Sequence, residues 1–299
     1  MQTIRIGSRG SDLALWQANH VKRQLEELGC TVSITIIKTQ GDAIQHLSFD
    51  KLEGKGFFTK EIENALLNNE IDLAVHSHKD LETTPPDGLV IAAVSEREDP
   101  SDLLLIAKNA FDENQQWGLK QDAIVGTSSA RRKSQVMRFR GDVEIKDLRG
   151  NVPTRIQKLR DGNYEAILLA KAGVDRLNID LSEFIVVVLD PTEFVPAPAQ
   201  GVLALQIREG DEQTASMVSK LDHPEISKRI AVERKVLNLM RGGCQLPLGV
   251  YCDEQLNVFV SHSTNWEEGS DLYEYECEDL SALPEMIVED LLESSEDDN

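Results

Sequence analysis

Short apolar runs bounded by turn residues alternate along this chain with segments of helical periodicity, and this alternation limits the fold more than any other feature. In the first third, the pattern predicts strands over residues 3–8, 32–38 and 72–76, with one helix that begins near Ser11 and another over 59–67. Strands that are separated by helices pair in parallel and are covered on both faces. The sequence therefore predicts an α/β architecture with mainly parallel sheets.

A second alternation begins after residue 100 and is long enough to build its own sheet. It consists of strands over 103–107, 123–126, 143–148, 166–169 and 184–189 and helices over 130–139 and 152–159. Three prolines, Pro191, Pro196 and Pro198, mark a crossing segment, because proline interrupts regular structure. The strand predicted over 202–207 is expected to return to the first sheet, which makes the first domain discontinuous.

The last part of the chain has the pattern of a small α+β domain. A helical stretch over 211–236 precedes strands over 250–252, 256–262 and 273–277 and a helix near 283–292. The acidic segment 293–299 has little to bury and is expected to be disordered. We therefore predict three domains: domain 1 from residues 1–96 and 197–212, domain 2 from 97–196, and domain 3 from 213–299.

The composition excludes several classes of protein. No apolar run approaches the roughly 20 residues that a membrane-spanning helix needs, so no membrane role is predicted. The formal net charge is -21, and the 58 residues after Arg241 contain sixteen Asp or Glu and no Lys or Arg, which argues against nucleic acid as a partner. Because Met1 leads directly into a predicted strand, without the features of a secretory signal, the chain is expected to be cytoplasmic.

The four cysteines, Cys30, Cys244, Cys252 and Cys277, show neither a metal-binding nor a disulfide pattern. His76 and His78 would share one face of a strand, but without suitable partners they predict no metal site. Cys244 differs from the other cysteines, because it lies between glycines and Pro247, where no regular helix or strand can run. That placement indicates an exposed, reactive thiol.

Arginines gather at three predicted strand ends of the second domain. Between Gly126 and Arg176 the chain has twelve Lys or Arg against six Asp or Glu. The turn with Thr127, Ser128 and Ser129 precedes Arg131 and Arg132, the next turn carries Arg149, Gly150 and Arg155, and Arg176 follows a third strand. Helix starts bind anions, and a guanidinium donates two parallel hydrogen bonds to a carboxylate. The pattern predicts a ligand with several carboxylates, with phosphate as an alternative.

The first domain repeats this pattern with fewer charges. Arg9 and Ser11 lie at a strand-to-helix turn, and Asp80 ends the sequence His76-Ser77-His78-Lys79-Asp80 after a predicted strand. Asp80 is the candidate acid or base, although an Asp in such a place more often caps a helix or forms a turn. The segment Gly54-Lys55-Gly56-Phe57-Phe58 is either a loop that closes over a ligand or an ordinary glycine-rich connection.

Over residues 4 to about 250 these motifs together resemble the porphobilinogen deaminase family, also called hydroxymethylbilane synthases, of tetrapyrrole biosynthesis. The motifs that carry the resemblance occur in one order: Arg9 and Ser11 with Leu13-Ala14-Leu15-Trp16-Gln17, Gly54-Lys55-Gly56, His76-Ser77 with Lys79-Asp80, Arg97-Glu98-Asp99-Pro100, Gly126 to Arg132, Leu148 to Val152 with Arg155, Gln200-Gly201, and Gly243-Cys244-Gln245 with Pro247. The resemblance implies two domains similar to a periplasmic binding protein, an active cleft between them, and a third domain that carries the cysteine.

The resemblance also implies the chemistry. A dipyrromethane cofactor is expected on Cys244 through a thioether, and it primes the condensation of four porphobilinogen molecules with loss of ammonia. Hydrolysis then releases 1-hydroxymethylbilane, so the chain is expected to be a transferase of porphyrin and haem biosynthesis, and a monomer. Each pyrrole carries an acetate and a propionate, which suits the arginines. By similarity, Asp80 lies beside the pyrrole nitrogens, assists the loss of ammonia and stabilises the cationic methylene-pyrrolenine intermediate.

The remaining site residues follow from the same resemblance. The cofactor is expected to contact Ser77, Lys79, Asp80, Thr127, Ser128, Ser129, Arg131, Arg132, Arg149 and Gly150. Substrate or the growing chain is expected to contact Arg9, Ser11, Gln17, Arg149, Arg155, Arg176 and Gln200, and an active-site loop carries Lys51, Lys55 and Phe58.

Two other classes of function stay open from the residues alone. A non-catalytic anion-binding module would use the arginines but would leave Cys244 without a role. A thiol-dependent transferase would use Cys244 as a transient nucleophile, but no His stands near that motif as its base.

Overall fold

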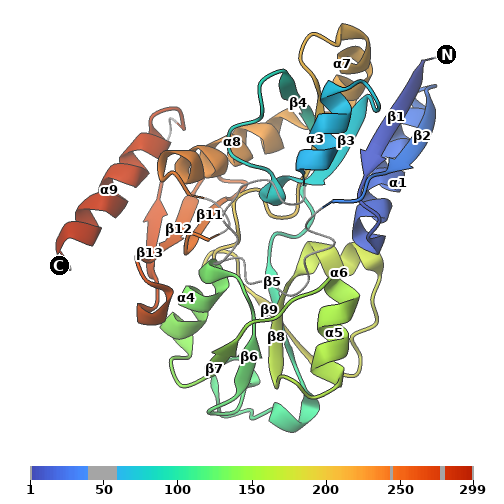
Figure 1. Cartoon of the computed structure of the whole chain (residues 1–299). Helices are drawn as coiled ribbons and strands as arrows, with labels where there is room; N and C mark the ends of the chain where they lie inside the picture. The colour runs from blue at the N-terminus through green and yellow to red at the C-terminus, as the bar shows by residue number, and fades with distance from the viewer. Residues whose placement is uncertain (1, 40–58, 243–244, 277–279, 298–299) are drawn as a thin grey trace. The chain divides into compact units, whose positions relative to one another are not determined.

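The computed structural model describes residues 2–39, 59–242, 245–276 and 280–297, with side chains described up to residue 293. These residues form two compact units (Figure 1). Unit 1 contains the described residues up to Glu98 together with Gln200–Lys228, and unit 2 contains Asp99–Ala199 with the described residues from Arg229 onward. The predicted division into three domains stays a prediction.

Unit 1 is built on a five-stranded sheet with the strand order β2-β1-β3-β10-β4. Its strands are β1 (Thr3–Ser8), β2 (Thr31–Ile36), β3 (Leu73–Ser77), β4 (Leu89–Val94) and β10 (Leu203–Arg208). β1 pairs in parallel with β2 and β3, whereas β10 runs antiparallel to β3 and β4. The predicted return of the strand after the prolines to the first sheet is therefore confirmed.

Helices cover both faces of this sheet. The helices of unit 1 are α1 (Asp12–Glu27), α3 (Lys60–Leu67) and α7 (Glu212–Val218), with the 3₁₀ turns η2 (His78–Asp80) and η5 (Ser219–Leu221). Val21 of α1 belongs to the core cluster that contains Val75 of β3, whereas Leu66 of α3 belongs to the cluster that contains Ala74. Successive side chains of a strand point to opposite faces, so this division follows from the alternation along β3.

Unit 2 contains a second five-stranded sheet with the order β7-β6-β8-β5-β9. Its strands are β5 (Asp102–Ile106), β6 (Ile124–Gly126), β7 (Glu144–Lys146), β8 (Ala166–Ala170) and β9 (Ile185–Leu189). β6 pairs in parallel with β7 and β8, and β5 runs antiparallel to β8 and β9. The connecting helices are α4 (Ala130–Phe139), α5 (Val152–Arg160) and α6 (Lys171–Leu177), with the turns η3 (Lys108–Ala110) and η4 (Gln116–Gly118).

A smaller α+β part follows in the sequence. It has a three-stranded antiparallel sheet and its helices, with the elements α8 (Pro224–Leu239), β11 (Leu248–Cys252), β12 (Val258–His262), η6 (Trp266–Glu268), β13 (Asp271–Tyr275) and α9 (Leu283–Asp297). Val236 of α8, Val260 of β12 and Ile287 of α9 share one buried core. Within unit 2, α4 contacts this part, since Arg138 Nη1 donates to Ser270 O at 2.8 Å. The predicted fold class, two α/β sheets with mainly parallel strands and a small α+β part, is confirmed.

Three predictions about local structure are wrong. The helical stretch predicted over 211–236 is interrupted, because Pro224 cannot continue a helix and instead begins α8. The segment predicted to be disordered continues α9 as far as Asp297. His78 does not lie on a strand with His76 but in the turn η2, so the two rings do not share a strand face.

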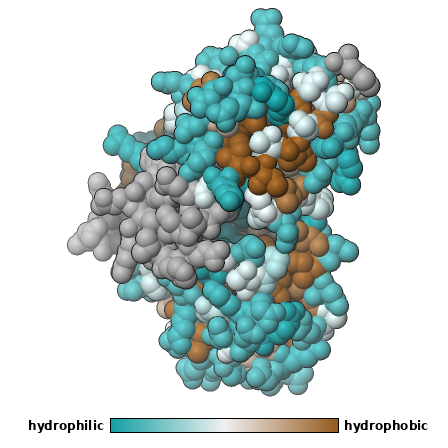
Figure 2. Space-filling view, turned by 45° about the vertical axis from the view of Figure 1, so that its right-hand side comes forward, coloured by the Kyte–Doolittle hydropathy of each residue, from teal (hydrophilic) through white to brown (hydrophobic). Residues whose placement is uncertain are grey.

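The face of the molecule in Figure 2 is mainly hydrophilic, with apolar areas of limited extent. This agrees with a chain in which 28% of the residues are charged. Among the residues that the structure describes, no helix combines the length and the apolar character that crossing a membrane requires.

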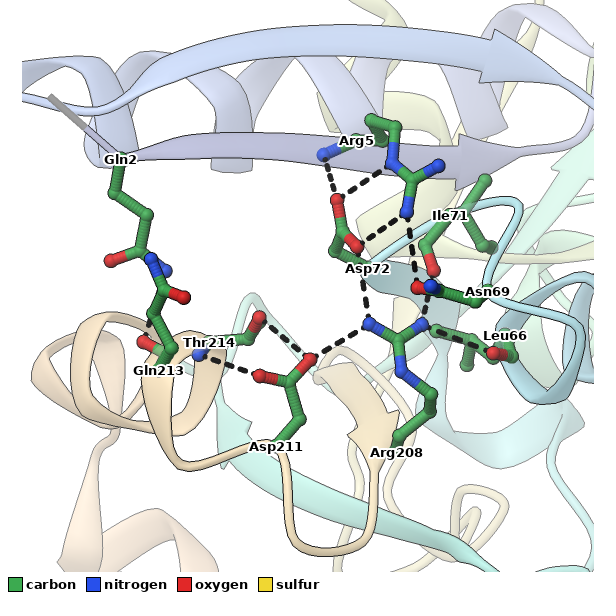
Figure 3. A network of polar contacts seen from close by, with 10 residues as sticks. All are labelled: Gln2, Arg5, Leu66, Asn69, Ile71, Asp72, Arg208, Asp211, Gln213 and Thr214. Atoms are coloured by element: carbon green, nitrogen blue, oxygen red, sulfur yellow. Dashed lines mark hydrogen bonds and ion pairs between the residues drawn. The ribbon is translucent and has the colours of Figure 1, made fainter.

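A charged network just before β3 joins residues of β1, α3 and β10 with the turn before α7 (Figure 3). Asp72 accepts hydrogen bonds from Arg5 N and Nε, both at 2.9 Å, and from Arg5 Nη2 at 2.8 Å. Arg208 Nη2 lies 3.1 Å from Asp72 Oδ1 and 2.8 Å from Asp211 Oδ2. Arg208 Nη1 also donates to the carbonyls of Leu66 and Ile71. The hydrogen bond from Arg5 is the largest cause that lowers the pKa of Asp72, to about 2, although burial opposes it.

Replacement of Asp72 by Asn is expected to lower the free energy of unfolding at pH 7 by about 1–2 kcal/mol, a value reduced for partial exposure. The folded-state pKa is depressed, so the contribution is present above the unfolded pKa of about 4 and is lost as the pH falls toward 2. Urea unfolding of both proteins from pH 7 to pH 2.5 checks this. An equal loss of stability in both proteins on acidification would contradict it.

Candidate active site

A pocket lies in unit 1 at the carboxyl ends of β1 and β3. It is lined by Arg9, Ala14, Gln17, Thr59, Ile62, Val75, His76, Ser77 and Asp80. Ligands of open α/β sheets bind at the carboxyl ends of strands, where loops and helix starts meet. The structure therefore brings together Arg9, Gln17, Ser77 and Asp80, which the sequence assigned to the site.

The residues after β3 are held from two sides. Gln17 of α1 is buried, and its Nε2 donates to Ser77 Oγ at 2.8 Å. Lys79 Nζ donates to Oε1 of the buried Gln200 at 3.0 Å, and the carbonyl of Gln200 accepts a hydrogen bond from Arg97 Nε at 3.0 Å. Lys79 and Gln200 are thus partners, while Asp80 in the same turn is exposed at the pocket.

Ser11 has a structural task in this structure. Its Oγ accepts a hydrogen bond from Ala14 N at 3.3 Å, which caps α1. This contact positions the start of the helix that carries Gln17.

In unit 2, the turns after β6 and β7 lie side by side because these two strands pair in parallel. Ser128 Oγ donates to the carbonyl of Leu148 at 3.1 Å and accepts from its amide at 3.0 Å, which joins the two turns. Ser129 Oγ accepts from Arg132 N and caps α4, and Thr127 is buried between strand and helix. Two of the three turns at which the sequence places arginines therefore lie together within this unit.

Arg131 and Arg132 are both buried and share one carboxylate, that of Asp102 at the start of β5. Arg131 Nη2 lies 2.8 Å from Asp102 Oδ2, and Arg132 Nη2 lies 2.7 Å from Oδ1. Arg131 Nη1 donates to Val195 O at 2.8 Å, and Arg132 Nη1 donates to Leu168 O at 3.2 Å. Burial lowers the pKa of Arg131, and the charge of Asp102 opposes that shift.

This arrangement leaves an excess of positive charge. Two guanidinium groups face a single fully buried carboxylate, and the Nε atoms of Arg131 and Arg132 have no hydrogen-bond partner among the described residues. Buried charge that is not balanced is costly, so an anionic group would be stabilised here. Asp102 was not predicted as a site residue, although an acid at the start of the apolar run Leu103-Leu104-Leu105-Ile106 is a signal for a buried ion pair.

The second turn of unit 2 carries Arg149, Gly150 and Arg155. Gly150 has φ 117°, and a Cβ there would lie 2.7 Å from Thr154 Cγ2, so a side chain at this position would be strained. Arg155 Nε donates to the carbonyl of Gly150 at 2.7 Å, which fixes the guanidinium beside the turn. Arg176 is buried near the end of α6.

Four predicted site residues lie outside the residues that the structure describes. They are the cofactor-attachment residue Cys244 and the loop residues Lys51, Lys55 and Phe58. Their assignments stay predictions.

Comparisons of the sequence with known proteins agree on one family. The sequence profile described as porphobilinogen deaminase, dipyromethane cofactor binding domain, matches residues 4–216. The porphobilinogen deaminase of Sulfurimonas denitrificans is 43% identical over 84% of this chain and 79% of its own length, and that of Chloroherpeton thalassium is 45% identical over 86% and 81%. A probable porphobilinogen deaminase of Methanocella arvoryzae is 46% identical over 83% and 79%.

Among solved structures, a putative methionine-binding lipoprotein of Bacillus subtilis aligns with a TM-score of 0.45 at 11% identity, over 75% of this chain and 92% of that chain. The family assignment depends on the sequence relatives, each of which is matched over more than two thirds of both chains. This chain belongs to the porphobilinogen deaminase family.

Proposed function

We propose that this chain has hydroxymethylbilane synthase activity. It joins four porphobilinogen molecules head to tail onto a dipyrromethane primer, with loss of ammonia at each step, and then releases 1-hydroxymethylbilane by hydrolysis. The observation that carries the proposal is the family membership over most of the chain. The activity belongs to tetrapyrrole biosynthesis.

The donor groups of unit 2 fit the cofactor, whose two pyrroles carry four carboxylates. When bound through Cys244, the dipyrromethane supplies the free pyrrole carbon onto which substrate is condensed. The excess positive charge of Arg131 and Arg132 supports carboxylate binding, as do their unpartnered Nε donors. The hydroxyls of Thr127 and Ser129 and the helix start at α4 add further donors, whereas the hydroxyl of Ser128 already donates to Leu148 O.

The other arginines suit the carboxylates of the substrate and the lengthening chain. Arg149 and Arg155 flank the turn at Gly150, and Arg155 is already oriented by its hydrogen bond to that carbonyl. Guanidinium groups stay protonated throughout the physiological range, so they bind acetate and propionate groups without a change of charge. We assign Arg9, Arg149, Arg155 and Arg176 to this task, with Ser11, Gln17 and Gln200 as supporting residues.

Asp80 is the proposed catalytic group. Its carboxylate is at the pocket of unit 1, next in sequence to Lys79, which is oriented by Gln200. A carboxylate there accepts hydrogen bonds from pyrrole N–H groups and offsets the positive charge that develops on the substrate when ammonia leaves. A fixed negative charge does this without the reorganisation that water would need.

The proposal includes Lys51, Lys55 and Phe58 as residues of an active-site loop, and it places the enzyme in the cytoplasm as a monomer. Light scattering of the purified protein tests whether it is a monomer.

Denatured intact mass of the purified protein tests the attachment of the cofactor. Protein made in cells with a porphobilinogen supply is expected to carry the mass of two linked pyrrole units, because the primer is built from the enzyme's own substrate. Cys244→Ser is expected to lack this mass, whereas Cys252→Ala, a change at a fully buried thiol, is the matched control and is expected to keep it.

Formation of 1-hydroxymethylbilane from porphobilinogen by the same samples completes the test. An unmodified wild-type chain that forms no product would remove the proposed function. If the adduct persisted in Cys244→Ser, the proposed activity would still stand, but the cofactor would have to be attached to a residue other than Cys244. A carrier without catalysis would bind porphobilinogen and return it unchanged.

A further inference from the structure

A chain of four buried polar side chains leads to the pocket of unit 1. Thr59 precedes α3, Glu63 lies on α3, Gln206 on β10 and His76 on β3, and none is more than 8% exposed. The Thr59 hydroxyl donates to Glu63 Oε2 at 3.2 Å. Gln206 Nε2 donates to Glu63 Oε1 at 3.1 Å, and Gln206 Oε1 lies 3.2 Å from His76 Nε2.

The register of the sheet places these groups together. In the antiparallel pair of β3 and β10, His76 is opposite Ala204 and Gln206 is opposite Ala74. His76 and Gln206 are therefore diagonal neighbours on one face of the sheet. It is the face that α3 covers, since Ala74 packs in the core with Ile62 of that helix.

The direction of the hydrogen bonds follows from the orientation of the Gln206 amide. Its nitrogen donates to Glu63 Oε1, and its oxygen faces His76 Nε2. An amide oxygen only accepts hydrogen bonds, so His76 Nε2 must carry a hydrogen. Nδ1 is then the nitrogen with a free lone pair, provided that the ring is neutral.

The surroundings of His76 keep its ring neutral at physiological pH. Burial, assisted by the positive charge of Arg9 and opposed by the hydrogen bond to Gln206, lowers the pKa of His76 to about 4. Glu63, on the element packed against β3, contacts Gln206 rather than the imidazole. At neutral pH the ring is therefore a fixed tautomer rather than a charged group.

Burial of such a chain of polar side chains is unfavourable in free energy. Polar groups in a core lose their hydration, and an apolar set of similar volume is often at least as stable. A fully connected network does, however, hold its members in one arrangement. The network ends at the pocket, beside Arg9, Ser77 and Asp80. This position indicates that the network orients His76 for a contact in that pocket.

We propose that His76 is a neutral hydrogen-bond acceptor in the pocket, fixed with hydrogen on Nε2 by Gln206 and Glu63, and that its Nδ1 accepts a hydrogen bond from an N–H group of the substrate beside Asp80. This role rests on the proposed function, because it assigns a substrate contact of that same site. Asp80 and His76 have different roles in this proposal. Asp80 supplies a negative charge, whereas His76 supplies a hydrogen-bond acceptor of fixed orientation and no charge.

Nitrogen NMR of the protein labelled with ¹⁵N-histidine tests the tautomer without substrate. The chain has six histidines, and His76→Gln identifies the signals of His76 by their loss. The expected spectrum has a protonated Nε2 and an unprotonated Nδ1 that do not titrate between pH 5.5 and 8. In Gln206→Leu the partner of Nε2 is gone, and the signals are expected to move toward a mixture of the two tautomers.

Steady-state kinetics test the role in the reaction. His76→Phe keeps the shape but removes both nitrogens, and kcat is expected to fall roughly 10- to 100-fold, the value of one hydrogen bond to a charged or polarised group. His76→Gln retains a donor and an acceptor and is expected to recover most of this loss. His262→Phe, at a buried histidine of β12 in unit 2, is the matched control and is expected to keep the wild-type kcat.

A wild-type His76 with hydrogen on Nδ1, or one that titrates between pH 5.5 and 8, would overturn the proposal. Wild-type kcat in a folded His76→Phe would do so as well. The NMR result is independent of turnover, and the proposed function is tested separately by product formation in the wild type. Failure of one is therefore distinguishable from failure of the other.

Discussion

Asp80→Asn is expected to lower kcat by roughly 10²- to 10⁴-fold while the protein keeps its covalently bound cofactor. Asparagine has nearly the same shape as aspartate, and Asp80 is exposed at the pocket, so the fold is not expected to change. What disappears is the negative charge that opposes the positive charge formed when ammonia leaves the substrate. Interactions that are stronger in the transition state than in the ground state act on kcat.

The measurement combines intact mass with steady-state kinetics. The variant is expected to show the mass of the wild type, a KM within a few-fold of it, and a much lower kcat. Asp87→Asn is the matched control, because Asp87 is an exposed carboxylate of unit 1 that does not line the pocket. If Asp80→Asn and Asp87→Asn had equal turnover, Asp80 would have no part in the mechanism.

The alternation of apolar runs and helical segments was sufficient to predict most elements of the fold. The helix predicted over 130–139 is α4, with the same bounds, because a serine cap and a clear periodicity mark its start and face. The helix predicted to begin near Ser11 is α1, and Ser11 caps it. Caps and periodicity depend only on residues that are close together in the sequence, so they can be recognised before the fold is known.

Contacts between distant residues could not be predicted in the same way. β4 was missed, although Leu89–Val94 is an apolar run of six residues after Gly88, and its pairing with β10 joins residues more than 100 positions apart. The network of Glu63, Gln206 and His76 joins residues up to 143 positions apart, and no spacing in the sequence records it. The break before α8 required the recognition of Pro224 as a helix start rather than as a helix residue.

The candidate site shows the same division between local and distant information. The sequence identified Arg131 and Arg132 as anion-binding residues from their place after a serine-rich turn. It did not identify Asp102, 30 positions before Arg132, as the carboxylate that both arginines contact. The charge of the site therefore depends on a residue that no motif near the arginines indicates.

Asp102→Asn is expected to lower the free energy of unfolding by about 3–5 kcal/mol, because it removes one partner of a buried ion cluster. Asp102 is 0% exposed, and Arg131 and Arg132 are 4% and 6% exposed, so water cannot replace the lost charge. In asparagine one of the two carboxylate oxygens is replaced by an NH₂ donor, so one of the two guanidinium groups would face a donor instead of an acceptor. Two like charges then remain next to each other in a core.

Asp142→Asn is the control for this change, since Asp142 also accepts from an arginine of the α4 region, Arg140, but its side chain is 34% exposed. Asp142, the acidic partner of that pair, lies at the surface. Loss of the pair is therefore expected to lower the free energy of unfolding by about 1 kcal/mol or less. Urea unfolding of the wild type and both variants measures the difference. Similar stabilities of the two variants would contradict a buried cluster held by Asp102.

The same substitution has a second expected result, which concerns binding rather than stability. With Asp102 neutral, the positive charge of Arg131 and Arg132 is larger but less firmly oriented, because Asp102 holds Nη2 of each and only the contacts of Nη1 with Val195 O and Leu168 O remain. Carboxylate recognition by guanidinium groups depends on geometry as well as charge. The folded fraction of Asp102→Asn is therefore expected to carry less covalent cofactor than the folded fraction of Asp142→Asn, as measured by intact mass after separation of native protein. Full loading of native Asp102→Asn would mean that the arginines are oriented without Asp102.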